Sequence, residues 1–124
     1  MIICRAILKT VLACCFTAST ALPAHAQTVI PTGSTITVPG TVLDLACTDL
    51  LVQGMFIVGS AQINQSANLG IASGGQLNAG QGTITVGGDW NNSGTFVAGT
   101  STVVLSDVCG NAQAQFTGNT TFYN

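Results

Sequence analysis

The sequence predicts an all-β protein, built as a parallel β-solenoid with coils of about 19–21 residues behind an N-terminal signal peptide. Thr, Val and Ile, which favour strands, alternate with short groups of Gly, Asn and Ser, which favour turns. A six-residue motif recurs at nearly constant spacing in the second half of the chain. No segment after residue 26 has the 3.6-residue apolar period of an amphipathic helix.

Residues 1–26 contain the three parts of a secretory signal peptide. Arg5 and Lys9 form a short positive region, and residues 10–22 are apolar or small. Ala24-His25-Ala26 is an A-x-A cleavage site. The sequence therefore predicts export through the inner membrane, and a location outside the cell or on its surface.

We expect cleavage between Ala26 and Gln27, which leaves residues 27–124 as the solenoid domain. A transmembrane segment needs about 20 apolar residues, and fewer than that lie between Lys9 and Pro23. An alternative is lipidation at Cys14, because Val11–Cys14 resembles a lipoprotein cleavage box. Lys9 leaves that alternative too short a hydrophobic core.

The domain after residue 26 contains no Lys, Arg, His or Glu. Nucleic acids and anionic lipid headgroups are bound through cations, so both are excluded as partners. Catalytic triads and Cys–His pairs lack their base, the phosphate-binding loop lacks its Lys, and zinc lacks its usual ligands. The sequence therefore predicts a protein without catalysis or cofactor. Apart from Cys and Tyr123, the only ionisable side chains are Asp44, Asp49, Asp89 and Asp107.

The repeated motif is G-x-[FL]-x-x-G, and its copies start 21 and then 19 residues apart. A period near 20 with β-branched strands fits one coil of a β-solenoid. Stacked corners require residues that adopt positive φ, so the glycines are expected at the turns. These turn glycines are Gly54, Gly59, Gly75, Gly80, Gly94 and Gly99.

The phase of the repeat extends beyond the motif, and one more period of 19 from Gly99 lands on Gly118. Aligned positions are Ile63, Ile84 and Val103, then Gln65, Val86 and Leu105, then Leu69, Trp90 and Cys109. Apolar residues at these positions should point inward and stack from coil to coil. The predicted core is Phe56, Leu77, Ile84, Val86, Trp90, Phe96, Val103 and Leu105.

The stretch GGDWNNSG, residues 87–94, admits three interpretations. Trp90 is in phase with Leu69, which favours a core or corner position over a platform for a sugar ring. Asp89, Asn91 and Ser93 match the first half of a calcium loop, D-x-N-x-S-G, and are a weak metal candidate. That loop normally closes with an acid at its twelfth position, which is a Thr here, so a plain turn is favoured.

Cys47 and Cys109 are the only cysteines after the signal peptide, and in an exported chain such a pair predicts a disulfide. They lie 62 residues apart, which is about three coils or roughly 14 Å along the axis. A disulfide needs Cα atoms within about 7 Å. The bond therefore requires the less patterned segment 106–118 to fold back, and two separate thiols are the alternative.

Residues 82–105, GTITVGGDWNNSGTFVAGTSTVVL, resemble a coil of large secreted bacterial surface proteins of the filamentous-haemagglutinin or autotransporter type. The resemblance covers roughly residues 41–124 and rests on structural motifs. It implies a structural or adhesive module of the bacterial cell surface, with glycans or other surface proteins as its partners.

Two departures from that family affect the expected architecture. The Ile-Pro-Thr-Leu sorting segment that some members carry is absent, so anchoring is not predicted. Residues 118–124 are similar to a strand that usually leads into further coils, and no capping element follows it. We therefore expect a short or truncated member of a longer design, with an open end that favours end-to-end self-association.

Two other functions compete with the adhesive one. Low charge, high β-propensity and repeats containing Gln and Asn favour a curli-like amyloid or matrix-forming protein. Paired carboxylates can hydrolyse glycosides, so Asp44 and Asp49 also make a polysaccharide-active enzyme a less favoured hypothesis.

Overall fold

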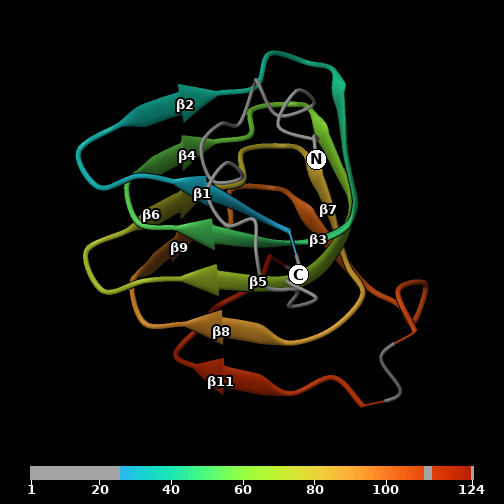
Figure 1. Ribbon diagram of the computed structural model, residues 1–124. Helices are drawn as coiled ribbons and strands as arrows, with labels where there is room; N and C mark the ends of the chain where they lie inside the picture. The colour runs from blue at the N-terminus through green and yellow to red at the C-terminus, as the bar shows by residue number, and fades with distance from the viewer. Residues whose placement is uncertain (1–25, 111–112, 124) are drawn as a thin grey trace, which may run out of the picture.

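The computed structural model describes residues 26–110 and 113–123, so the predicted signal peptide lies outside it except for Ala26. All described elements are strands, which coil into a β-solenoid of about four turns (Figure 1). The strands are β1 (Gln27–Ile30), β2 (Thr35–Thr37), β3 (Val42–Val52), β4 (Met55–Ile57), β5 (Gln62–Ile71), β6 (Gln76–Asn78), β7 (Thr83–Val86), β8 (Trp90–Asn92), β9 (Thr95–Val97), β10 (Thr102–Leu105) and β11 (Phe116–Gly118).

Each turn of the solenoid contributes a parallel strand to each of three faces. Face A stacks β1, the second half of β3, the second half of β5, β8 and β11. Face B stacks β2, β4, β6 and β9. Face C stacks the first half of β3, the first half of β5, β7 and β10. The long strands β3 and β5 bend through the corner between faces C and A, so they belong to both.

Face B has the register that the repeat predicts. Phe56 pairs with Leu77, and Leu77 pairs with Phe96, in unbroken parallel ladders. The same column begins one coil earlier, where Ile36 pairs with Phe56. The sequence motif missed this first coil because Ser34 and Pro39 stand near the places that later coils give to Gly.

The predicted core fills the inside of the solenoid up to its last coil. Phe56, Leu77, Ile84, Val86 and Trp90 are all buried. Phe96 and Val103 pack against this core while partly buried. Leu105 was also assigned to the core, but its side chain is 44% exposed. It occupies an inward column above Val86, and none of the described strands of face C lies over it.

The turn glycines are required for two different reasons. Gly59, Gly80 and Gly99 have φ of 65°, 58° and 58°, the left-handed conformation expected at stacked corners. Gly54, Gly75 and Gly94 do not have positive φ, so that reason fails for them. A Cβ at Gly94 would lie 2.4 Å from the carbonyl oxygen of Ala72, because the backbones of successive coils approach closely there.

Three register positions differ from the sequence alignment. Ser66, rather than Gln65, pairs with Val86, because a bulge shifts the register of β5. Phe116, rather than Cys109, pairs with Trp90, because the chain makes an added loop between β10 and β11, of which residues 106–110 and 113–115 are described. Gly118 pairs with Asn92 on face A and is therefore not the next turn glycine after Gly99.

The last coil has a partial cap that the sequence did not predict. After β11, the segment 119–123 crosses the end of the solenoid and places Phe122 against Trp90 and Phe96, with ring centroids 5.3 and 5.7 Å away. The indole N–H of Trp90 donates to Oγ1 of Thr120. This segment therefore covers the core above faces A and B, whereas β10 on face C keeps an open edge.

The structure of residues 26–110 and 113–123 contains no helix with the length and hydropathy of a membrane span.

Candidate functional site

A column of Asp and Asn side chains runs along the corner where the chain enters face A. Asp49 Oδ1 accepts hydrogen bonds from the backbone N–H and the side-chain amide of Asn68. Asn68 Oδ1 accepts from the N–H of Asp89, and Asp89 Oδ1 accepts from the N–H of Gln115. Each side chain thus satisfies a backbone donor of the following coil. This ladder gives Asp49 and Asp89 a structural role.

The weak calcium candidates lie around the same corner. One carboxylate oxygen of Asp89 faces the N–H of Gln115, while Asn91 is an exposed position of β8 and Ser93 is exposed in the following turn. The neighbouring Asn92 is buried, and its Oδ1 accepts from the N–H of Gly94. The stretch 87–94 is therefore a corner, a strand and a turn of one coil.

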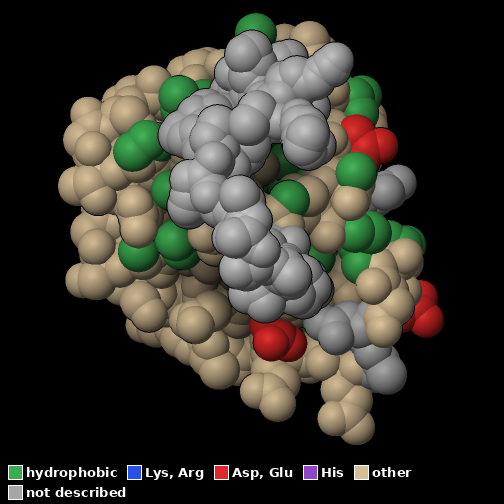
Figure 2. Space-filling model, viewed as in Figure 1, with side chains coloured by type: hydrophobic (Ala, Val, Ile, Leu, Met, Phe, Trp, Pro, Cys, Tyr) green, Lys and Arg blue, Asp and Glu red, His purple; other side chains and the backbone are tan. Residues whose placement is uncertain are grey.

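The two carboxylates expected of a glycosidase each accept hydrogen bonds from other groups of the solenoid. Asp44 Oδ1 accepts a hydrogen bond from the N–H of Ala46, and Asp49 Oδ1 accepts from Asn68 in the ladder described above. Asp107 is exposed in the added loop. Among the described residues, no three His, Cys, Asp or Glu side chains form a group that could hold a metal. Among the described residues, the surface in view shows a few acidic side chains and no basic ones (Figure 2).

Cys47 and Cys109 form a disulfide, with their Cα atoms 5.5 Å apart. Two local features overcome the separation along the axis. Ala46 and Cys47 have positive φ, so the chain loops outward where the β3–β5 register shifts. Cys109 folds back against Gly87 in the preceding coil, where a Cβ on that glycine would come within 2.9 Å of Cys109 Sγ. The bond therefore fastens the added loop to the corner of an early coil.

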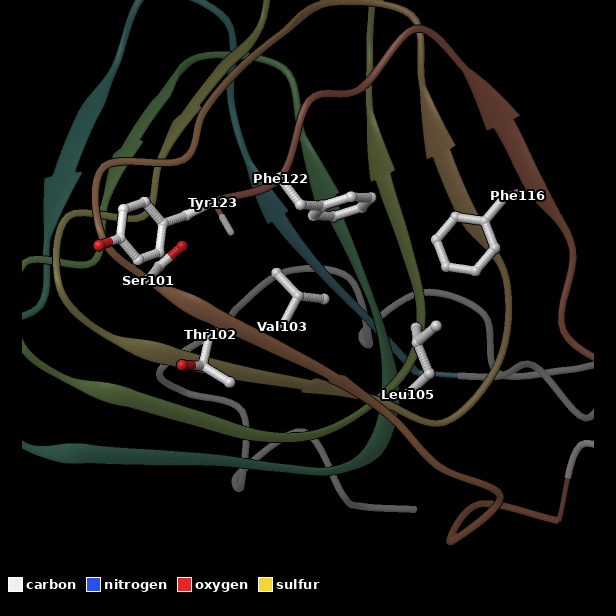
Figure 3. A pocket seen from close by; sticks show the side chains of 7 residues that line it. All are labelled: Ser101, Thr102, Val103, Leu105, Phe116, Phe122 and Tyr123. Carbon is white, nitrogen blue, oxygen red and sulfur yellow. The ribbon is translucent and has the colours of Figure 1, made fainter.

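A hollow of about 370 Å³ opens at the end of the solenoid beside β10. Val103 and Leu105 point from β10 toward Phe122 and Phe116, across the space that Figure 3 shows. Ser101 lies at the same rim; it is 5% exposed, and its buried Oγ has no hydrogen-bond partner. The lining is completed by Thr102 and Tyr123, and it contains no ionisable group other than the phenol.

A second, shallower hollow of about 270 Å³ lies over the turns that lead from face A to face B. Its lining consists of Gly, hydroxyl and amide residues, including Thr32, Ser34, Gln53 and Gln76, together with Met55. It contains no aromatic residue, so it offers a stacking platform to neither a sugar nor a peptide.

The faces carry columns of uncharged outward side chains. On face B, one column contains Thr35, Met55, Gln76 and Thr95. On face C, another contains Val42, Gln62, Thr83 and Thr102. Because the ladders hold their register, these side chains stand in straight rows about 4.8 Å apart.

Exposed large apolar side chains are confined to the two ends of the solenoid. Those of the first coil are Val29, Ile36 and Val42, and those of the last coil and its loop are Val97, Val104, Leu105, Val108, Phe116 and Tyr123. In the described residues, the middle coils expose none. The ends are thus the apolar surfaces of the protein.

Comparison with known proteins gave no match among family models, curated proteins or solved structures.

Proposed function

We propose that this chain is an exported structural or adhesive β-solenoid module of a bacterial cell surface. The observation that carries the proposal is the set of straight, uncharged columns on faces B and C, where three of the four side chains in each column are Thr or Gln. Hydroxyl and amide groups in fixed rows suit hydrogen bonding to neutral glycans, which also present repeated hydroxyls. Each contact is weak, and repetition along the rows supplies avidity.

Blocking one face at a time tests this proposal. Gln76→Lys places a long charged side chain in the middle of face B, and Gln62→Lys does the same on face C; neither position is buried. Retention on immobilised neutral polysaccharides should fall for one variant and stay unchanged for the other. EDTA should not alter it. The adhesive role would be refuted if the wild-type protein were retained on no neutral polysaccharide, or if the wild type and both variants were retained equally.

Export is tested separately on the chain expressed with residues 1–26. We expect the protein in the periplasm or medium with Gln27 at its N-terminus, where β1 begins and Ala26 is exposed. Retention in the cytoplasm at full length would contradict the secretory assignment.

A matrix-forming role is the second candidate, and the confinement of exposed apolar side chains to the two ends favours it. End-to-end association would bury these surfaces. Light scattering should then show a mass that rises with protein concentration, and thioflavin binding would distinguish fibres from short stacks. A constant monomer mass at high concentration would exclude this role.

A further inference from the structure

The turns that lead from face A to face B alternate in length from coil to coil. Four residues form the turns of the first and third coils, 31–34 and 72–75, whereas two residues form those of the second and fourth coils, 53–54 and 93–94. Figure 1 shows the consequence: the turns after β1 and after β5 project beyond the turn after β3, which lies between them. The second coil therefore leaves a notch at this corner.

The two projecting turns have the same structure. In each, the carbonyl of the first residue accepts a hydrogen bond from the N–H of the fourth, and the third residue is a glycine with positive φ, Gly33 at 81° and Gly74 at 87°. This is the pattern of a β-turn that requires glycine at its third position. A Cβ on either glycine would meet no atom within 4 Å, so both turns extend into solvent as the walls of the notch.

The spacing of the sequence repeat encodes the notch. The motif copies start 21 and then 19 residues apart. The segments between successive turns, 55–71 and 76–92, are equally long, so the difference of two residues lies in the turns alone. Packing also fixes the short turn, because a Cβ at Gly54 would collide with the carbonyl oxygens of Pro31 and Ser34 in the coil below.

The hollow of about 270 Å³ occupies this notch. Its lining comes from both projecting turns, from the short turn that forms its floor, and from the outward column of face B through Thr35, Met55 and Gln76. The projecting turns lie two coils apart, or about 9.6 Å between backbones. Small-ligand pockets usually measure about 300–1,000 Å³, so a notch just below that range fits one narrow chain.

We propose that this notch binds one residue of a neutral saccharide chain, which crosses the corner between the two projecting turns. The inference rests on the adhesive function proposed above. It assigns the specific contact of that function to one corner of the second coil, with the chain lying across the solenoid axis in the notch.

The floor of the notch offers side chains rather than backbone donors. The N–H groups of Gln53 and Gly54 both donate to the carbonyl of Ile30, and the N–H of Met55 donates to that of Ser34. Strand addition depends on free main-chain groups. An extended peptide would find no free N–H on this floor, which favours a ligand that binds through side chains.

The lining side chains suit a ligand rich in hydroxyl groups. Gln53 and Gln76 contribute half-buried amides, and Thr32 and Thr35 contribute exposed hydroxyls. Each of these groups both donates and accepts hydrogen bonds, as sugar hydroxyls do. None of the described residues that line the hollow is charged or aromatic, so hydrogen bonds, rather than ion pairs or stacking, would hold the ligand. Met55 adds an apolar contact for the C–H groups of a sugar ring.

The test is an NMR titration of the isotopically labelled protein with maltohexaose, cellohexaose and chitohexaose at millimolar concentrations. At least one of them should shift the side-chain amide signals of Gln53 and Gln76 and the backbone amide signal of Gly74. Shifts that leave out Gln53 and Gly74, and follow face C instead, would overturn the inference and leave the adhesive function standing. The absence of any shift with all three oligosaccharides would overturn both.

Two turn replacements change the depth of the notch or a matched turn outside it. Replacement of Gln53-Gly54 by Ala-Ser-Gly-Gly, the sequence of 72–75, lengthens the floor to the height of the walls and should abolish the shifts. The same replacement at Ser93-Gly94 lengthens the turn of the fourth coil, which does not line the hollow, and should leave them intact. Far-UV circular dichroism checks that both variants keep the solenoid.

A pair of point variants tests the same site without altering a turn. Gln53→Ala removes the amide of the floor and should raise Kd by about tenfold, the effect of one net hydrogen bond. Gln81→Ala removes an exposed amide at the corner between faces B and C and should leave Kd unchanged. Equal effects of the two substitutions, or unchanged binding in a folded variant whose notch is filled, would overturn the inference.

Discussion

Removal of the disulfide should cost a large part of the stability of this protein. The perturbation is the double substitution Cys47→Ser and Cys109→Ser, which keeps side chains of similar size at both positions. The bond closes a loop between residues 62 positions apart. In the chain-entropy model, opening that loop adds about 14 cal/mol/K to the unfolded chain, or about 4 kcal/mol at 25 °C. Small domains have a total free energy of unfolding of about 5–15 kcal/mol.

The assay is urea denaturation of the oxidised protein and the double variant, followed by far-UV circular dichroism. We expect the free energy of unfolding to fall by about 4 kcal/mol, and the denaturant slope to rise because the open unfolded chain exposes more surface. The reduced wild-type protein should behave like the variant. A loss below about 1 kcal/mol, with an unchanged slope, would refute the loop-entropy reasoning.

Two substitution pairs test the packing of the coils. Gly94→Ala should lower the stability by about 2 kcal/mol, or roughly 10 °C in Tm, because its Cβ would meet the backbone oxygens of Ala72 and Gly75 at 2.4 and 2.5 Å. The control is Gly70→Ala, whose Cβ would meet only a flexible Leu side-chain atom, at 3.3 Å, and should cost little. A similar fall in Tm for both variants, measured by calorimetry, would contradict the argument that the backbones approach closely at Gly94. Asn68→Ala removes two hydrogen bonds of the ladder: the one that the Asn68 side-chain amide donates to Asp49, and the one that Asn68 Oδ1 accepts from the N–H of Asp89. This should lower the free energy of unfolding by about 2–4 kcal/mol. As a control, substitution of the exposed Asn91 by Ala should change the free energy of unfolding, measured by urea titration, by no more than about 0.5 kcal/mol. If Asn68→Ala also left the stability unchanged, the ladder would have no stabilising role.

Much of the solenoid was predictable because its signals are local and repeated. Alternation of Thr with Ile or Val in β7 predicts a strand with one inward side, and the burial of Ile84 and Val86 follows from it. Coil length follows from the spacing of the glycine motif, and it placed Phe56, Leu77 and Phe96 in one column.

The added loop and the bulge were not predictable, because they interrupt the repeat. Cys109 was aligned with Trp90 on spacing alone. The added loop lengthens this coil, so Phe116 is the residue that pairs with Trp90. Nothing in the local sequence distinguishes Gln65 from Ser66 as the residue in phase, since a bulge is decided by the neighbouring coils. The Asp–Asn ladder could have been found from the spacing of Asp49, Asn68 and Asp89, which follows the repeat.

The sequence by itself determined the all-β class, the coil length, the inward residues of the middle coils and the absence of basic chemistry after residue 26. These depend on propensity and period, which each segment carries alone. Only the tertiary structure decided the approach of Cys47 to Cys109, the partial cap around Phe122 and the open edge of β10. Those features depend on contacts between segments that lie far apart in the sequence, and no local pattern encodes such contacts.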